Sequence, residues 1–300
     1  MSIVAPSSTA PVLAVQNIKG GVGKTSVAVN LAARLAARNG KSVLVIDADA
    51  QSNASLYLLD TVRWSRIVDG KVDEGTLYDL FAQQVSYVDI VTGEDFGPRR
   101  RPRTYVTTVY DRNGQLDLVT SSPKLFEVQE MAPELLVRRI RDWVRRKLTS
   151  YDLVIIDCPP SISTVSLAAL RAADKILIPM KADYFSVVGL PLLVNSLKDY
   201  RDLLRIPAEV AGVLLTMVPL QDKRKREYKR SVAIREQIEE VCEAMDIPLL
   251  DAQIGQSEEY PISFDQHKPI PFKPVGRGRE LGELDALISE LGLDKSGGDA

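Results

Sequence analysis

A glycine-rich loop between two lysines is the feature that most constrains how this chain folds. Residues 19–25 read KGGVGKT; they follow an apolar run at 12–18 and open a helical pattern at 25–38. Glycines let backbone N–H groups approach phosphate oxygens, and a helix start adds positive potential. Lys24 can then reach the β- and γ-phosphates of a nucleotide, and the Thr25 hydroxyl can ligate Mg²⁺. A plain glycine turn does not explain why the lysine, the hydroxyl residue and the strand–loop–helix context coincide.

The rest of the chain alternates between short apolar runs and helical patterns. Within each run, apolar residues do not alternate with polar ones, which is typical of strands buried on both faces. The runs lie at 12–18, 42–47, 152–157, 175–179, 210–218 and 247–254. The helical patterns lie at 25–38, 123–148, 163–172, 187–204, 231–244 and 279–291. This order predicts an α/β fold with a mostly parallel twisted sheet flanked by helices. Ligands of such sheets bind beyond the carboxyl ends of the strands.

Residues 60–114 interrupt this rhythm with short mixed elements. Segments 104–110 and 115–120 flank an Arg-Asn-Gly turn at 112–114, which predicts a β-hairpin. We interpret 60–114 as an insertion in a single P-loop ATPase domain that spans residues 1–293. The last residues, 294–300, are rich in Gly and Asp, which favours a disordered tail.

Composition excludes several classes of protein. The chain has 45% hydrophobic and 26% charged residues, as ordinary globular proteins do. Two cysteines, Cys158 and Cys242, cannot build a disulfide framework and point to a reducing compartment. One histidine, His267, excludes zinc sites that need two. Neither a signal peptide nor an apolar run of membrane-spanning length is evident, so we expect a cytoplasmic protein without a membrane partner.

Carboxylates end two of the predicted strands. Asp47 and Asp49 lie two residues apart after the second run, so they point the same way from the pleat. Asp157 ends the apolar run at 152–157, which is a Walker B arrangement. Near a phosphate-binding loop, such carboxylates suit Mg²⁺, its water shell or an attacking water. The alternative for the first pair is a polar turn after a strand.

The loop departs from the usual P-loop pattern in an informative way. Ile18 stands where that pattern has its first glycine, and Lys19 is an additional lysine. The segment resembles the deviant Walker A motif, xKGGxGK(T/S), of the family that contains ParA, Soj and MinD. The resemblance implies that Lys19 reaches across an ATP-sandwich dimer to the partner's phosphates. It also implies that Asp49 positions the hydrolytic water, and that Asp47 and Asp157 support Mg²⁺ together with Thr25.

Further segments are similar to this family. The DADAQSN run at 47–53 resembles DxDPQGN, and the DCPPS run at 157–161 matches D(T/C)PPS, so Cys158 is interpreted as a packing residue rather than an iron–sulfur ligand. Gly212 to Met217 matches a GVLLTM strand whose end lies near the adenine. Residues 268–270 and 277–280 match C-terminal motifs in part, whereas 60–114 is unmatched. The implied nucleotide-binding residues are Lys19, Gly20, Gly21, Val22, Gly23, Lys24, Thr25, Ser26 and Met217, and the implied catalytic residues are Lys19, Lys24 and Asp49.

Positive charge is segregated although the net charge is only -2. Six of the eight residues at 223–230 are basic, and further basic clusters lie at 138–147 and 99–103. Such clusters can neutralise DNA phosphates without reading bases, although most charge runs are solvated surface. We favour DNA binding by Lys223, Arg224, Lys225, Arg226, Lys229 and Arg230. Many relatives carry arginines where this chain has an acidic stretch at 256–261, so the DNA surface, if present, differs here.

The resemblance favours a ParA-like positioning ATPase. Such a protein forms an ATP-dependent homodimer, binds DNA non-specifically and is released when a ParB-like or other cargo-bound activator stimulates hydrolysis. Its cargo is a plasmid, a chromosome locus or a protein assembly, and it associates with the nucleoid. One competing hypothesis is a MinD-like membrane-cycling ATPase, against which the acidic segment at 279–300 argues. Two more are a DNA-independent ATPase that regulates a partner, and a metabolic enzyme of the same fold.

Overall fold

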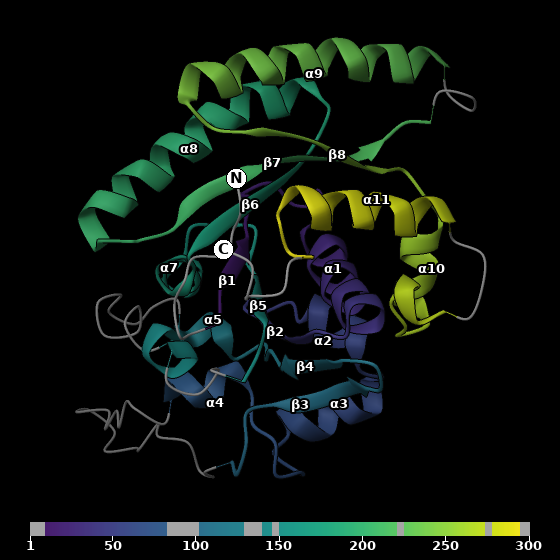
Figure 1. The fold of residues 1–300 in the computed structure, drawn as a ribbon. Coiled ribbons are helices and arrows are strands. Elements are labelled where there is room, and N and C mark those ends of the chain that lie inside the picture. Colours follow the sequence, from purple (N-terminus) through teal and green to yellow (C-terminus); the bar gives the residue numbers. More distant parts are fainter. Residues whose placement is uncertain are drawn as a thin grey trace.

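A computed structural model shows one eight-stranded sheet with helices on both faces (Figure 1). It describes residues 10–82, 102–128, 140–145, 150–220, 225–273 and 278–294. The strands lie in the order β3-β4-β2-β5-β1-β6-β7-β8, and every neighbouring pair is parallel except β3 with β4. The predicted α/β fold with a mostly parallel sheet is therefore confirmed.

The central strands are buried on both faces, as their unbroken apolar runs predicted. The strands are β1 (Val12–Val15), β2 (Ser42–Asp47), β3 (Thr107–Asp111), β4 (Gln115–Val119), β5 (Leu153–Asp157), β6 (Lys175–Lys181), β7 (Glu209–Val218) and β8 (Leu249–Gly255). β1 lies between β5 and β6 and ends earlier than predicted, because residues 16–18 already belong to the loop.

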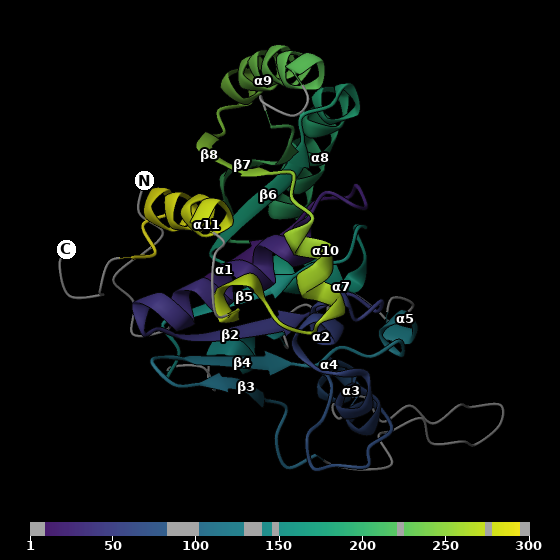
Figure 2. The same ribbon diagram turned by 90° about the vertical axis from the view of Figure 1, so that its right-hand side faces the viewer.

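Two sets of helices cover the two faces of the sheet. The helices are α1 (Lys24–Asn39), α2 (Asn53–Leu58), α3 (Thr61–Val68), α4 (Leu77–Ala82), α5 (Leu125–Val128), α7 (Thr164–Ala172), α8 (Tyr184–Leu204), α9 (Lys225–Met245), α10 (Glu259–Asp265) and α11 (Gly278–Glu290), with the 3-10 turn η1 (Ile270–Phe272). α1, α2 and α11 pack on one face, and α7, α8 and α9 on the other (Figure 1). Figure 2 shows α8 and α9 together at one end of the sheet and β3 at the opposite end.

The predicted hairpin is present as β3 and β4. Gly114 makes its turn possible, because a Cβ there would lie 2.5 Å from the Lys41 carbonyl oxygen. β4 is buried and pairs with β2, so this hairpin extends the main sheet. The single helix expected over 123–148 is seen only as α5 and helical residues 140–145, since 129–139 and 146–149 lie outside the described residues. The expected tail after 294 also lies outside them.

Candidate nucleotide site

The glycine-rich loop joins the carboxyl end of the central strand β1 to the start of α1. Gly21 and Gly23 adopt φ values of 68° and 84°, the left-handed conformation that glycine adopts without strain. Gly20 and Gly21 are exposed, whereas Val22 between them and α1 is buried. The first N–H groups of a helix have no carbonyl partner within it. The loop therefore presents backbone donors and a helix start to the edge of the sheet where ligands bind.

Two polar residues outside the motif hold this loop in place. The Thr216 hydroxyl, at the end of β7, donates a buried hydrogen bond of 2.7 Å to the Val22 carbonyl oxygen. The Asn17 side chain donates to the Pro179 carbonyl at 2.8 Å and accepts from the Lys19 N–H at 3.0 Å. Sequence reasoning missed both roles. The available signal was a polar residue near the end of each apolar run, Asn17 in 12–18 and Thr216 in 210–218.

Lys24 lies folded back over the loop. Its Nζ donates to the Lys19 carbonyl oxygen at 3.2 Å, and the residue is only 7% exposed. Burial lowers the pKa of Lys24, and the nearby carboxylates Asp157 and Asp49 partly offset that effect. A buried ammonium in this position gains most from an added anion, which would replace the solvation that it has lost.

Thr25 and Asp157 meet at the centre of the site. The Thr25 hydroxyl donates to Asp157 Oδ2 at 2.7 Å, while Asp157 Oδ1 is buried without a hydrogen-bond partner among the described residues. Burial and the neighbouring carboxylate of Asp47 raise the pKa of Asp157. An orphaned buried carboxylate oxygen beside a hydroxyl fits a bound Mg²⁺ with its waters. Within the described ranges no three His, Cys, Asp or Glu side chains form a metal cage, and Mg²⁺ in phosphate sites does not need one.

Asp47 ends β2, and Asp49 lies two residues beyond it in the chain. Asp47 aligns with Asp157 across the β2–β5 pairing. Its carboxylate accepts from the Ser55 N–H at 2.7 Å, the Ser55 hydroxyl at 2.6 Å and the Asp49 N–H at 3.2 Å. Burial raises the pKa of Asp47 to about 7. Asp49 Oδ1 accepts from the Gln51 N–H at 2.9 Å, so the two carboxylates order the turn into α2.

Lys19 points toward α8 and not over the loop. Its Nζ forms an ion pair of 2.6 Å with Asp183 and lies 5.6 Å from the centre of the Phe185 ring. Asp183 also caps α8 by accepting from the Ser186 N–H at 2.9 Å. Burial alone would raise the pKa of Asp183, but its hydrogen bonds with Lys19 and Ser186 lower it on balance. No local pattern indicates this partner, which lies 164 residues away.

The remaining residues of the implied nucleotide set lie around the loop. Met217 adopts a left-handed φ of 53°, and its Cε lies 3.8 Å from where a Cβ on Gly23 would be. It is 38% exposed, so it borders the loop at the surface. Ser26 lies in the first turn of α1, and its carbonyl oxygen accepts from the Asn30 side chain at 2.8 Å.

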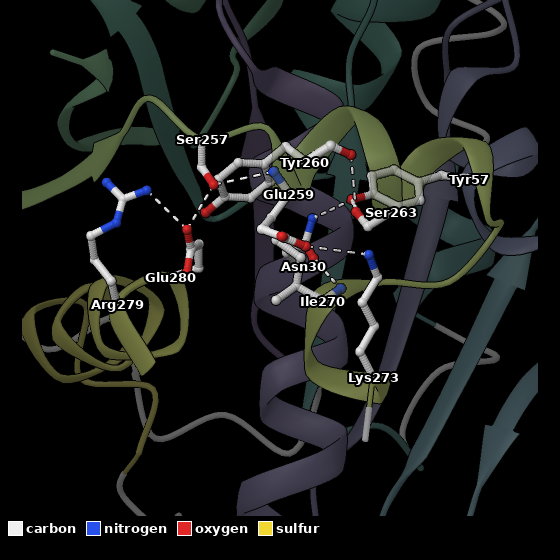
Figure 3. A network of polar contacts seen from close by, with 10 residues as sticks. All are labelled: Asn30, Tyr57, Ser257, Glu259, Tyr260, Ser263, Ile270, Lys273, Arg279 and Glu280. Atoms are coloured by element: carbon white, nitrogen blue, oxygen red, sulfur yellow. Dashed lines mark hydrogen bonds and ion pairs between the residues drawn. The ribbon is translucent and has the colours of Figure 1, made fainter. Parts of the chain in front are cut away.

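A polar network ties the C-terminal segment to α1 and α2 (Figure 3). Asn30 on α1 donates to the Tyr57 hydroxyl of α2 at 2.9 Å and accepts from the Ile270 N–H at 2.9 Å. The Tyr57 hydroxyl also contacts the Ser263 hydroxyl on α10. Glu259 pairs with Lys273, so one acid of the 256–261 stretch serves packing within this network. Sequence reasoning missed both α10 and this network.

The predicted DNA-binding residues are only partly described. Lys223 and Arg224 lie outside the described residues, and Lys225 and Arg226 begin α9 without described side chains. Lys229 and Arg230 are exposed on α9. In the 138–147 cluster, Ile140 and Val144 are buried and Arg145 pairs with Asp174, as in an ordinary amphipathic helix. In the 99–103 cluster, Arg103 pairs with Asp73, and 99–101 are not described.

The two cysteines lie near opposite ends of the strands. Cys158 follows β5 beside the nucleotide site, and burial raises the pKa of its thiol. Cys242 lines a cavity of about 670 Å³ between α8, α9 and the first residues of β6 and β7. This separation favours packing roles over a shared iron–sulfur cluster. No helix in the described part of the chain is both long and apolar enough to span a bilayer.

Comparisons with known proteins identify the family of this chain. A family model described as an AAA domain matches residues 10–210. The sporulation initiation inhibitor protein Soj of Bacillus subtilis is 33% identical over 213 residues, which cover 69% of this chain and 72% of that protein. The chromosome-partitioning ATPase Soj of Treponema pallidum is 31% identical over 72% of this chain and 75% of that protein.

A solved structure gives the same fold over nearly the whole chain. A variant of McdA from Cyanothece in complex with ATP superposes with a TM-score of 0.68 at 22% identity, over 95% of this chain and 98% of that one. At this identity the likeness shows the fold, whereas the sequence relatives show the family. The chain therefore belongs to the ParA/Soj family of P-loop ATPases.

Proposed function

We propose that this protein is an ATPase that positions DNA or a protein cargo through an ATP-dependent homodimer. The arrangement of Lys24, Thr25 and Asp157 beside the glycine-rich loop at the start of α1 carries the proposal. Lys24 would hold the β- and γ-phosphates, while Thr25 and Asp157 would hold Mg²⁺. Mg²⁺ would neutralise the charge that develops on the phosphates during hydrolysis.

The remaining carboxylates take supporting roles in this proposal. Asp49 orients the attacking water. Asp47 supports the Mg²⁺ site indirectly, because its hydrogen bond with Ser55 orders the turn beside that site. Lys19 leaves Asp183 and reaches the phosphates bound by the partner subunit. Phosphate charge competes well for this lysine, because its ion pair with Asp183 is only partly buried and such pairs contribute little. Met217 borders the nucleotide on the adenine side.

We assign the proposed DNA surface to the basic first half of α9. Lys229 and Arg230 are exposed there, and Lys223, Arg224, Lys225 and Arg226 belong to the same cluster. Binding of this kind is non-specific and salt-sensitive, because it rests on phosphate neutralisation. The proposed protein acts in the cytoplasm on the nucleoid, and a ParB-like or other cargo-bound activator stimulates hydrolysis and release. Residues 1–293 then act as one ATPase domain, elaborated at 60–114.

The deciding experiment is a salt-titrated DNA gel shift with ATP, ADP or no nucleotide. DNA binding that occurs with ATP, but not with ADP or without nucleotide, and that weakens as the salt concentration rises supports the proposal. Lys24→Ala should abolish nucleotide binding in calorimetry and DNA binding with it. Equal DNA binding in all three states would contradict the nucleotide switch, and no binding in any state would favour an ATPase that regulates a partner without DNA.

A matched pair of variants tests the DNA surface. Replacing Lys229 and Arg230 by glutamine should weaken DNA binding and reduce its salt dependence, while leaving ATP binding unchanged. Replacing Arg63 and Arg66 by glutamine is the control, because both are exposed on α3 at the other end of the sheet and the net charge changes equally. Equal losses in the two variants would show an effect of net charge and contradict the assignment to α9.

A further inference from the structure

Ser121 lies just beyond the carboxyl end of β4, beside the turn that carries Asp47 and Asp49. β4 pairs in parallel with β2, and Val119 is aligned with Ile46, so the residues that follow the two strands run alongside each other. We call residues 47–52 the aspartate turn. Ser121 is fully buried, and a buried hydroxyl needs hydrogen-bond partners. Those of Ser121 come from the segment after β2.

The hydroxyl of Ser121 holds the main chain of Asp49. It donates a hydrogen bond of 2.5 Å to the Asp49 carbonyl oxygen, across 72 residues of sequence. The same carbonyl oxygen accepts from the Ser52 N–H at 2.8 Å, which closes the aspartate turn. Ser121 thus ties this turn to β4 and fixes where Asp49 lies relative to the sheet.

The main-chain N–H of Ser121 supports the other aspartate through Ser55. It donates to the Ser55 hydroxyl oxygen at 2.9 Å, and the Ser55 hydroxyl donates to Asp47 Oδ2 at 2.6 Å. A serine hydroxyl has one proton and two acceptor sites, so Ser55 can make both bonds at once. Ser121 is therefore connected to both aspartates, to Asp49 directly and to Asp47 through one side chain.

The aspartate turn needs such support from outside. Ser52 adopts a left-handed φ of 59°, which residues other than glycine rarely adopt. Strained conformations of this kind persist where the surrounding structure holds them, and they cluster at functional sites. The hydrogen bond from Ser121 is one such restraint, because it acts on the residue whose carbonyl closes the turn.

The carboxylate of Asp49 is held on one side only. Its Oδ1 accepts from the Gln51 N–H at 2.9 Å, whereas its Oδ2 has no hydrogen-bond partner within the part of the chain that the structure describes. Asp49 is 8% exposed, so a small ligand such as water can still reach it. The direction in which Oδ2 points depends on the main chain of Asp49, which Ser121 holds.

We propose that Ser121 is a positioning residue for ATP hydrolysis and that it acts through Asp49. This inference rests on the proposed function, in which Asp49 orients the attacking water. Ser121 itself touches neither the nucleotide nor the water. A displacement of about 1 Å at a catalytic group can lower a rate by about 100-fold, so a loosened aspartate turn should slow hydrolysis while nucleotide binding is retained.

The test compares the rate of hydrolysis with the affinity for nucleotide. Single-turnover hydrolysis of ATP registers slow rates, and calorimetry with a non-hydrolysable analogue gives the affinity. Ser121→Ala removes the donor to Asp49 and keeps the main-chain bond to Ser55. The hydrolysis rate should fall by roughly 10- to 100-fold, whereas the affinity should change by less than about twofold. Losses of equal size in rate and affinity would indicate general damage to the site and would overturn the positioning role.

Ser122→Ala is the matched control. Ser122 is the next residue and is only 1% exposed, but its hydroxyl accepts from the Lys124 N–H at 3.3 Å, on the side of α5. The same substitution at this position should leave the hydrolysis rate at the parent value. A rate that falls equally in the two variants would contradict a specific role of Ser121.

A double-mutant cycle shows whether Ser121 acts through Asp49. Two residues that work as one unit give effects that do not add. In the background of Asp49→Ala, the change Ser121→Ala should therefore lower the hydrolysis rate no further. A second loss of full size in that background would show that Ser121 acts elsewhere, and it would overturn the inference.

Hydrogen exchange gives a measurement that needs no nucleotide. The amides of Gln51 and Ser52 donate within the aspartate turn, so their protection from exchange reports how often the turn opens. Their protection should fall by about fivefold in Ser121→Ala, in line with the loss of one hydrogen bond, and should not change in Ser122→Ala. Unchanged protection in Ser121→Ala would contradict the view that Ser121 holds the turn.

The outcomes separate this inference from the proposed function. A parent chain that hydrolyses ATP, and slows in Asp49→Ala but not in Ser121→Ala, overturns the inference alone. A parent chain that binds the analogue but hydrolyses no ATP overturns the proposed function and this inference with it. Slowed hydrolysis in Ser121→Ala with retained affinity, and with no further loss in the Asp49→Ala background, supports both.

Discussion

Thr216→Val should loosen the phosphate loop while barely changing the volume of the side chain. The hydroxyl of Thr216 donates a 2.7 Å hydrogen bond to the Val22 carbonyl, and both residues are at most 1% exposed. Valine leaves that carbonyl without a partner in a place that water does not reach. An unsatisfied buried group costs about 1–3 kcal/mol, so the free energy of unfolding should fall by that amount.

Thr107→Val is the matched control for this change. Thr107 is also 1% exposed, but its hydroxyl has no hydrogen-bond partner among the described residues. Removing an unsatisfied buried hydroxyl should leave stability unchanged or raise it. The same substitution of threonine by valine is therefore expected to lower the free energy of unfolding at position 216 and not to lower it at position 107.

Urea unfolding of the nucleotide-free chain distinguishes the two cases. The midpoint should fall by roughly 0.5–1 M for Thr216→Val and should not fall for Thr107→Val. ATP binding, measured by calorimetry, should also weaken in the Thr216 variant, because its loop is less well ordered before the ligand arrives. Equal midpoints in the two variants would refute the view that this hydrogen bond holds the loop.

Three further predictions concern the carboxylates. Because the pKa of Asp47 is raised to about 7, the folded chain binds the proton on this carboxyl more tightly than the unfolded chain, and the free energy of unfolding decreases as pH rises from about 4 to 7. Asp47→Asn should make the urea unfolding midpoint depend less on pH between these values. A variant whose midpoint changes with pH as steeply as that of the parent would contradict this. Asp183→Ala and Asp60→Ala should each lower the free energy of unfolding by about 1 kcal/mol, because each removes the N-cap of a helix, α8 and α3 respectively. Only Asp183→Ala also frees Lys19 from its ion pair, so only this variant should dimerise at a lower ATP concentration than the parent. Equal ATP requirements in the two variants would refute the view that Asp183 holds Lys19 back. Asp49→Ala should keep an ATP-bound dimer on DNA, visible as slow release in filter binding, and release at the parent rate would contradict its role in hydrolysis.

The sequence predicts the parts of this molecule that depend on local patterns. The apolar runs indicated the strands, because strands covered on both faces must be apolar throughout. The spacing of glycine, lysine and threonine indicated the loop. The lengths of elements were less accurate where an apolar run continued past the strand, as at 16–18.

The sequence could not predict contacts between distant segments. Lys19 and Asp183 are 164 residues apart, and Tyr57 and Ser263 are 206 apart. Each is an ordinary polar residue in its local context, and only the crossover connections of the sheet bring them together. Short elements such as α2 and α10 were also missed, because six or seven residues are too few to show a helical period.

The position of β1 within the sheet has a consequence for motion at the site. Four strands lie beyond it on one side and three on the other, so its amides are far from either edge. Hydrogen exchange in such strands proceeds through global unfolding, whereas edge strands open locally. We therefore expect the loop after β1 to be attached to some of the most slowly exchanging backbone in the described part of the chain. If the proposed nucleotide binding changes the surface around the loop, we expect the amides of β1 to keep their protection from exchange throughout.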